Sequence, residues 1–192
     1  MKKRLILASA SPRRKELLSD AGFVFDIITS NADEVAITGS PETTVLMNAR
    51  LKAKEVFDRN SDAIVLGADT VVCLDGRILG KPKDMNDARN MIKSLSGSVH
   101  EVLTGYSIID ENGEESGVTV TKVCFRIITD AEIEEYIQTD EPYDKAGGYG
   151  IQDRAGEFVK YIDGDLNNVI GLPVCDIKPI LDRIVQKHDE SI

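Results

Sequence analysis

The stretch of this sequence best suited to chemistry is residues 62–82, DAIVLGADTVVCLDGRILGKP. One apolar run precedes Asp69 and another follows it, and a carboxylate in such a place is costly to bury unless a cation or a metal pairs with it. Asp75 and Gly76 predict a tight β-turn, which would place Lys81 on the return strand across from Asp69. The two charges form either a structural ion pair or part of a functional site, and this stretch alone does not decide between them.

A second candidate is the turn SASPRR, residues 9–14. Ser11 is suited to cap a helix that begins at Pro12. Serine hydroxyls, free backbone N–H groups and the guanidinium groups of Arg13 and Arg14 would then meet at a helix N-terminus, where an anion such as phosphate binds. Taken alone, two solvated arginines are the simpler interpretation.

Two further stretches carry polar residues in unusual density. Asp33 and Glu34 follow a predicted strand, and adjacent carboxylates suit a hard cation such as Mg²⁺ or Mn²⁺, although they are also common in exposed loops. Residues 141–156, EPYDKAGGYGIQDRAG, combine four glycines with charged side chains and Gln152. Glycine-rich backbone allows close approach to a ligand. The stretch lacks the spacing of a dinucleotide or P-loop motif, so a long surface turn is the alternative.

Around these motifs, apolar periodicity and capping residues predict alternating strands and helices, and hence an α/β fold. Strands are expected at residues 4–9, 23–30, 63–66, 71–74, 99–110, 117–127 and 156–162. Helices are expected at residues 12–21, 41–59, 84–95 and 129–138 and after residue 173, with Pro179 causing a kink or a restart in the last one. Ligands bind at loops beyond strand ends in such sheets, so the polar clusters could share one site.

Composition narrows the choice of partners and compartment. The chain has 192 residues, enough for one large domain or two lobes that share a sheet. A net charge of -10 and the absence of Trp disfavour nucleic acid as a partner. The three widely spaced cysteines disfavour zinc and disulfides. Because the sequence shows neither a signal peptide nor a membrane-spanning run, we expect a cytoplasmic protein without a membrane partner.

Together the motifs supply groups for handling a nucleotide. Cations for a polyphosphate are Arg13, Arg14, Lys52 and Lys81; carboxylates for a metal or a base are Asp33, Glu34 and Asp69; and Gln152 could read a base edge. With a divalent metal, this inventory suits attack of water on a nucleotide phosphorus. Neither His100 nor His188 lies in a signature of nucleophilic catalysis.

Five segments, in the same order, resemble the Maf family of nucleoside triphosphate pyrophosphatases: LILASASPRRKELL, GADTVVCLDGRILGKP, LSGSVHEVLTG, EPYDKAGGYGIQ and DGDLNNVIGLP. The resemblance implies one domain over residues 1–192. It also implies an α/β fold similar to the inosine triphosphate pyrophosphatases, with a long mixed sheet flanked by helices and a cleft between two lobes. The implied reaction is hydrolysis of a nucleoside triphosphate to the monophosphate and pyrophosphate, with Mg²⁺ or Mn²⁺ as cofactor.

Position by position, the resemblance implies roles for single residues. Asp69 matches the proton acceptor for the attacking water, and it could instead be a metal ligand together with Glu34. The substrate-binding positions are matched by Ser9, Arg13, Arg14, Lys52, Thr70, Lys81 and Gln152; among these, Arg13, Thr70 and Gln152 fit the subgroup that acts on dTTP and UTP. Asp153 departs from the glycine that the family often has there, which bears on the shape of the loop and on base preference.

Two alternatives remain open at this stage. One is a nucleotide-sensing regulator of cell division without meaningful turnover, and the other is a phosphatase that removes the terminal phosphate. The resemblance favours clearance of modified pyrimidine nucleotides. For assembly we expect a homodimer, which no residue pattern decides.

Overall fold

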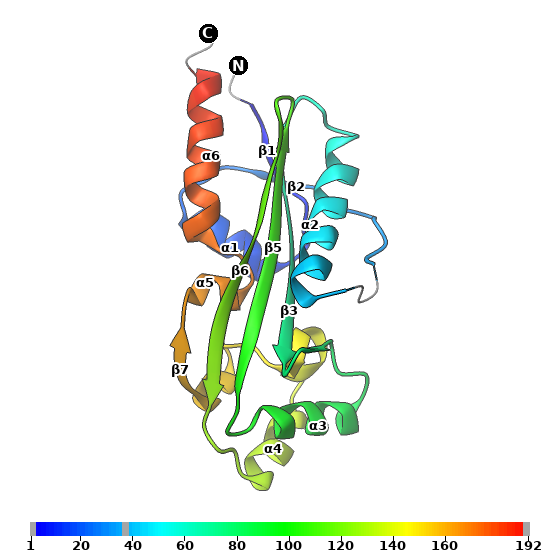
Figure 1. The fold of residues 1–192 in the computed structure, drawn as a ribbon, viewed down its shortest axis with the longest axis vertical. Coiled ribbons are helices and arrows are strands. Elements are labelled where there is room, and N and C mark those ends of the chain that lie inside the picture. The colour runs from blue at the N-terminus through cyan, green and yellow to red at the C-terminus, as the bar shows by residue number, and fades with distance from the viewer. Residues whose placement is uncertain (1–2, 36–38, 190–192) are drawn as a thin grey trace. The chain divides into compact units, whose positions relative to one another are not determined.

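The computed structural model describes residues 3–35 and 39–189 and shows a mixed α/β fold (Figure 1). Its seven-stranded sheet has the order β2-β1-β3-β5-β6-β7, and β4 pairs with β3. The strands are β1 (Leu5–Leu7), β2 (Asp26–Ile27), β3 (Ile64–Leu74), β4 (Arg77–Leu79), β5 (Val99–Asp110), β6 (Gly113–Phe125) and β7 (Val159–Asp163). β1 is parallel to β2 and β3, whereas β4 is antiparallel to β3 and β7 to β6, so the sheet is mixed as expected.

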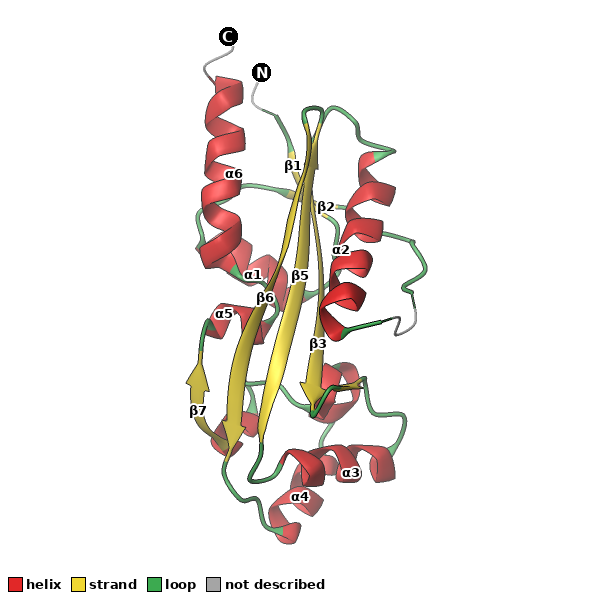
Figure 2. Ribbon diagram, in the orientation of Figure 1, coloured by secondary structure: helices red, strands yellow, loops and turns green. Residues whose placement is uncertain are grey.

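Helices flank the strands, as Figure 2 shows. They are α1 (Pro12–Asp20), α2 (Pro41–Phe57), α3 (Met85–Leu95), α4 (Asp130–Ile137), α5 (Leu166–Ile170) and α6 (Val174–Asp189). Short 3₁₀ helices form at η1 (Glu141–Asp144), η2 (Ala146–Gly148) and η3 (Arg154–Phe158). Of the described helices, none has the length and apolar character required to cross a membrane.

The chain forms two compact units, each of which is built from several segments. The first comprises Met1–Asp69, Thr104–Thr119 and Gly171–Ile192, and the second comprises Thr70–Leu103 and Val120–Ile170. Strand β3 contributes to both, because Asp69 is the last residue of the first unit's opening segment and Thr70 begins the second unit.

In the first unit, α2 packs closely against the sheet (Figure 1). A Cβ at Gly67 of β3 would lie 2.4 Å from the carbonyl oxygen of Ala49, and one at Gly105 of β5 would lie 2.4 Å from that of Val45. Both strands therefore need glycine, because helix backbone occupies the place of a side chain. An aliphatic cluster lies at this contact and includes Ile6, Ala8, Ala53, Val56, Ala63 and Val65.

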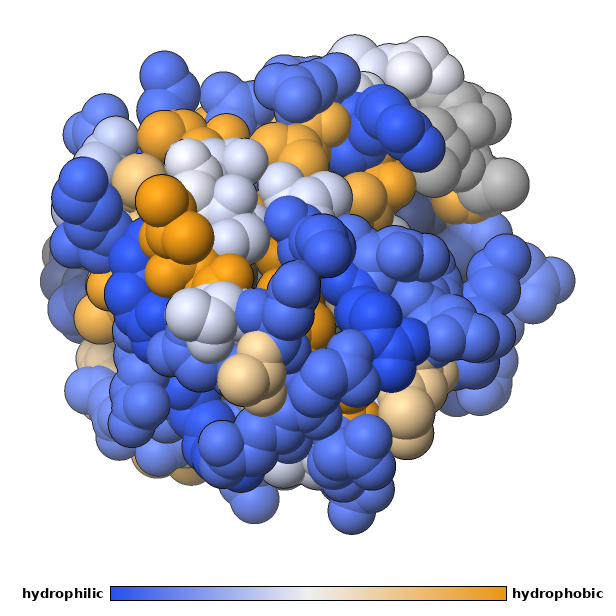
Figure 3. Space-filling model, turned by 90° about the horizontal axis from the view of Figure 1, so that it is seen from below, coloured by the Kyte–Doolittle hydropathy of each residue, from blue (hydrophilic) through white to orange (hydrophobic). Residues whose placement is uncertain are grey.

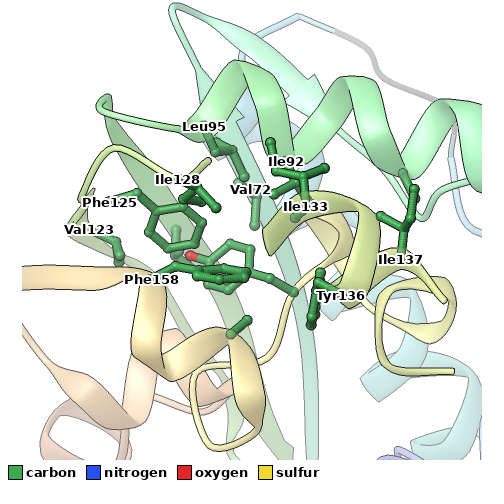
Figure 4. Close-up of a cluster of buried hydrophobic side chains, with 14 residues drawn as sticks. Val72, Ile92, Leu95, Val123, Phe125, Ile128, Ile133, Tyr136, Ile137 and Phe158 are labelled. Carbon is green, nitrogen blue, oxygen red and sulfur yellow. The ribbon is translucent and has the colours of Figure 1, made fainter. Parts of the chain in front are cut away.

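In the second unit, α3, α4 and the 3₁₀ helices enclose a larger apolar cluster, which Figure 4 shows in close-up. Phe125 makes edge-to-face contacts with His100, Tyr149 and Phe158, at ring-centroid distances between 4.9 and 6.1 Å. The other labelled members of the cluster are Val72, Ile92, Leu95, Val123, Ile128, Ile133, Tyr136 and Ile137. Of the ten Phe and Tyr residues in the chain, four are buried in this core and a fifth, Tyr143, packs against it.

The local signals in the sequence predicted most helix starts and the hairpin. Ser11 caps α1, and Thr129 forms a capping box with Glu132 at the start of α4. Asp75 and Gly76 both have positive φ, as a tight turn between β3 and β4 requires. The surface seen in Figure 3 is mostly hydrophilic, with separate apolar patches, in keeping with an ordinary water-exposed exterior.

Some expectations about the sheet were wrong. The strand expected over residues 23–30 is reduced to Asp26–Ile27, since β2 is an edge strand with one neighbour and Val24 is 94% exposed. Strand β6 alternates as its sequence indicates, and its threonine face is the one that is buried here: Thr121 is fully buried while Val120 is 42% exposed, and the Thr121 hydroxyl donates to the carbonyl oxygen of Asp165 at 3.1 Å. The strand also begins at Gly113, earlier than the expected residue 117.

Two elements in the C-terminal part of the chain also differ from expectation, and the structure decides between two alternatives for a third. The last strand begins at Val159, because the preceding residues form η3. Helix α5 was not anticipated. Helix α6 runs through Pro179 as one element, so the helix does not restart there.

We expect Gly67→Ala to lower the free energy of unfolding by about 1–3 kcal/mol, because the added methyl group would overlap backbone of α2. Urea unfolding followed by circular dichroism would measure the change. Gly80→Ala is the matched control, since a Cβ there meets nothing within 4 Å, and its effect should stay within about 0.5 kcal/mol. Equal effects of the two substitutions would contradict the close contact.

A second prediction concerns His100, whose side chain is 1% exposed and whose Nε2 lies 2.6 Å from the hydroxyl oxygen of Tyr149. Burial lowers the pKa of His100 from 6.5 to about 4. Above pH 6.5 the imidazole is neutral in both the folded and the unfolded chain. As the pH falls below 6.5, only the unfolded chain takes up the proton, so stability falls toward pH 4.

From this shift, His100 should account for a loss of about 2 kcal/mol of stability between pH 7 and pH 5. Urea unfolding across this range should give a shallower pH dependence for His100→Gln than for the wild type. The comparison between the two proteins removes the contribution of the carboxylates. Identical slopes would contradict the buried neutral imidazole.

Candidate functional site

Asp69, 8% exposed in strand β3, receives hydrogen bonds on both carboxylate oxygens. Nζ of Lys52 donates to Oδ1 at 2.7 Å, and Nδ2 of Asn48 donates to Oδ2 at 3.1 Å. Asn48 and Lys52 are four residues apart in α2 and therefore lie on one face of the helix. The helix thus supplies both partners of this carboxylate.

The cation that pairs with Asp69 therefore comes from α2, whereas the hairpin interpretation placed Lys81 opposite it. The reason lies in the register of the hairpin, in which Val72 is the partner of Leu79. Strand β4 ends at Leu79, so Lys81 lies beyond the paired residues.

Lys52 also pairs with the loop that follows β2. Its Nζ lies 2.7 Å from Oε1 of Glu34 as well as 2.7 Å from Oδ1 of Asp69. Oδ1 of Asn48 accepts a hydrogen bond from the backbone N–H of Val35 at 2.9 Å. Of the adjacent pair of acidic residues, Glu34 is the one held beside Asp69. Helix α2 contacts its loop at a third point as well, because Oε2 of Glu55 accepts from the backbone N–H of Asn31 at 3.2 Å.

The turn before α1 fixes Arg14 with a set of hydrogen bonds. The hydroxyl oxygen of Ser9 accepts from Nη1 of Arg14 at 3.1 Å, and Nε of Arg14 donates to the carbonyl oxygen of Gly171 at 2.8 Å. Ser9 is 8% exposed and Arg14 is half-buried. The hydroxyl of Ser11 accepts from the backbone N–H of Arg14 and caps the helix, as expected.

Electrostatic influence places Arg14 in the same cluster as the acidic residues. Burial lowers the pKa of Arg14 from its ordinary value; the charge of Asp69 opposes this, that of Arg13 adds to it, and that of Glu34 opposes it. The first unit therefore gathers six of the residues predicted to bind phosphate or metal, a hydroxyl, three cations and two carboxylates: Ser9, Arg13, Arg14, Lys52, Glu34 and Asp69.

The remaining predicted residues lie in the second unit. Thr70 follows Asp69 in β3 and is half-buried, Lys81 is exposed after β4, and Gln152 is exposed in the turn between η2 and η3. The backbone N–H of Gly147 donates to the carbonyl oxygen of Gly80 at 2.9 Å. The segments that carry Lys81 and Gln152 are therefore bonded to each other within this unit.

Close packing at two glycines reinforces this contact. Gly147 and Gly148 have φ values of 70° and 73°, and a Cβ on them would lie 2.9 Å from Val72 and 3.0 Å from Pro82, respectively. The glycine-rich stretch thus has a structural reason for two of its glycines. Any contact with a ligand is additional to it.

Asn48 is the residue that sequence reasoning missed. Its type carries no catalytic signal, and the sequence does not show that it is buried in α2. The one available clue was its spacing of four residues from Lys52, which puts both side chains on one helix face. Recognising that Asp69 lies opposite this face required the tertiary structure.

The residues present fit a divalent cation of the magnesium type. Within residues 3–35 and 39–189, no group of three or more His, Cys, Asp and Glu side chains could form a complete metal cage. Mg²⁺ is usually held by one or two carboxylates, with waters and substrate phosphates completing its shell. Glu34 and Asp69, both within 2.7 Å of Lys52 Nζ, provide such a pair.

Comparison with known proteins shows which family the chain belongs to. A family model described as Maf-like protein matches residues 4–184. A dTTP/UTP pyrophosphatase of Thermococcus gammatolerans is 52% identical over 88% of this chain and 91% of its own length. The dTTP/UTP pyrophosphatases of Alkaliphilus metalliredigens and Bacillus pumilus are 51% and 47% identical over 94% and 93% of this chain, covering 95% of each relative.

Among solved structures, the nucleoside-triphosphatase or dITP/XTP pyrophosphatase of Mycobacterium abscessus is 17% identical, with a TM-score of 0.45. The match covers 65% of this chain and 75% of that chain.

We expect Asn48→Ala to lower the free energy of unfolding by about 1–3 kcal/mol, because Asp69 Oδ2 and the Val35 N–H would both lose a buried partner. Hydrogen exchange should show faster exchange of the Val35 amide. Asn90→Ala, at an exposed position of α3, is the control and should leave both quantities unchanged. Unaltered exchange at Val35 in the Asn48 variant would contradict the tether.

Proposed function

The chain belongs to the Maf family, and from this membership we propose that it hydrolyses nucleoside triphosphates, dTTP and UTP foremost, to the monophosphate and pyrophosphate. The observation that carries the proposal is the position of Lys52, which joins Asp69 of β3 to Glu34 of the loop after β2. The names of the three relatives described above support the reaction, and a nucleotide-sensing regulator is not favoured.

In the proposed reaction, water attacks the α-phosphorus and the bond from that phosphorus to the bridging oxygen of the β-phosphate breaks. Pyrophosphate then leaves as the anion, and Asp69 accepts the proton of the attacking water. Negative charge on the phosphates is neutralised by Lys52, Arg13 and Arg14. Fixed cations contribute to catalysis in this way because they stabilise the charge of the transition state. The buried setting of Asp69 keeps its carboxylate oriented by donors from α2.

We assign Glu34 and Asp69 to a Mg²⁺ or Mn²⁺ cofactor. A divalent cation supplies, when bound, charge neutralisation and a more acidic water. Lys52 lies between the two carboxylates and balances part of their charge in the absence of the cation. The metal requirement would appear as loss of turnover in excess EDTA and its recovery on adding either metal.

We propose substrate contacts for seven residues. Phosphate and sugar contacts are assigned to Ser9, Arg13, Arg14, Lys52, Thr70 and Lys81, and recognition of the pyrimidine base to Gln152. The amide of Gln152 can donate and accept at once, which suits the adjacent carbonyl and N–H groups of uracil and thymine. We further propose one domain over residues 1–192, a cytoplasmic homodimer, and a role in clearing modified pyrimidine nucleotides.

The decisive experiment incubates the purified protein with UTP or dTTP plus Mg²⁺ or Mn²⁺ and measures pyrophosphate and orthophosphate separately. The wild type should release pyrophosphate in step with UMP or dTMP. Asp69→Asn should lower kcat by about 10²–10⁴-fold while UTP binding, measured by calorimetry, persists. Asp62→Asn, at an exposed position, is the control and should match the wild type.

Other outcomes would overturn the proposal in different ways. Orthophosphate with UDP as the product would identify a phosphatase of the terminal group. Binding of UTP without turnover in the wild type would point to the regulator. Full activity in Asp69→Asn would remove Asp69 from the reaction.

A further inference from the structure

Lys145, between η1 and η2, is a buried lysine with only 8% of its surface exposed. A buried ammonium group is costly unless hydrogen bonds and an opposite charge compensate it. Nζ of Lys145 donates to the carbonyl oxygen of Glu141 at 2.9 Å and to Oδ1 of Asp144 at 2.8 Å. Nζ of Lys145 also lies 3.4 Å from Oδ2 of Asp153, the residue that follows Gln152 in the chain.

The stem of Lys145 is as constrained as its charge. A Cβ at Gly150 would lie 2.7 Å from Cε of Lys145 and 2.5 Å from Oδ2 of Asp153, so the backbone at this glycine rests on both side chains. The backbone N–H of Asp153 donates to the carbonyl oxygen of Gly150 at 3.2 Å. The turn of residues 150–153 therefore includes Gln152, and it packs against the Lys145 side chain.

We propose that Lys145 is a positioning residue that fixes the turn of residues 150–153 and thereby sets the orientation in which Gln152 meets the base. This inference rests on the proposed function. Gly150 and Asp153 flank Gln152 in the chain, and Lys145 contacts both. The Gln152 side chain is exposed, so its backbone is what the lysine can fix.

Base preference is the property that this positioning controls. Uracil offers a carbonyl oxygen beside an N–H, whereas cytosine offers an amino group beside a bare nitrogen. A glutamine amide can present either pattern by rotating about its last side-chain bond. The fixed turn therefore sets the distance and direction of the amide from the base edge, and a preference for uracil requires that both be correct. The ends of the segment are anchored as well, by the bond from Lys145 to Glu141 and by that from Gly147 to Gly80.

Asp153 supplies a carboxylate to Lys145, which a glycine at this position could not do. The Lys145 ammonium has one carboxylate before the segment, in Asp144, and a second one after it, in Asp153. The side chain of Asp153 is 40% exposed, so its pair with Lys145 can be altered without opening the core. Asp153 is therefore one of the contacts that hold the turn of residues 150–153 on Lys145.

The test compares kcat/KM for UTP and CTP in Lys145→Met, with Lys160→Met, an exposed lysine of the same unit, as the matched control. In Lys145→Met the preference for UTP should fall by about tenfold, the value of one misplaced hydrogen bond. The fall should come mainly from a higher KM for UTP. Lys160→Met should keep the wild-type preference, and Lys145→Met should have no further effect on preference when added to Gln152→Ala.

Asp153→Asn keeps the core intact and should shift the preference in the same direction by about twofold to threefold, so it decides the matter if Lys145→Met fails to fold. Equal losses for UTP and CTP, an additive loss in the double variant, or no preference in the wild type would overturn the positioning role. If the wild type hydrolysed neither nucleotide, the proposed function would fail. The ratio of the UTP and CTP binding constants in the same variants would then judge Lys145.

Discussion

The ion pair between Asp69 and Lys52 is the interaction on which the first unit's candidate site depends. Asp69 lies in a buried strand, where an ionised carboxylate without a partner would cost several kcal/mol. Helix α2 offsets this cost, because Lys52 donates a hydrogen bond to one carboxylate oxygen and Asn48 donates to the other. The same two side chains hold the loop of Glu34, so the demand of one buried charge organises the site around it.

The second unit solves a similar problem in a different way. Lys145 is buried among carboxylates and a carbonyl group, and the glycine-rich segment folds around it. Here the buried charge is a lysine and its partners come from a loop. At Asp69 the buried charge is a carboxylate on a strand and its partners come from a helix. In both cases a buried ion fixes a segment that bears a residue with a proposed role in substrate binding.

The sequence predicted those parts of the fold that local chemistry determines. The turn at Asp75 and Gly76 and the helix caps at Ser11 and Thr129 depend on residues close in the chain, and the structure confirms them. The partner of Asp69 depends on tertiary contact, which explains why Lys81 was placed opposite it in error. The burial of Thr121 likewise depends on tertiary contact, since its hydrogen-bond partner is 44 residues away.

The contacts at Gly67 and Gly105 limit how α2 can move on the sheet. Helix backbone lies this close to the strands only where they carry glycine, so a shift of α2 along the sheet would bring it against side chains instead. A slip of one helical turn, about 5.4 Å, would bring one of Asn48 and Lys52 roughly to the place of the other, so Asp69 would lose one of its two donors. The two glycines thus determine where α2 lies on the sheet. The positions of Asn48 and Lys52 relative to Asp69 depend on that placement of the backbone.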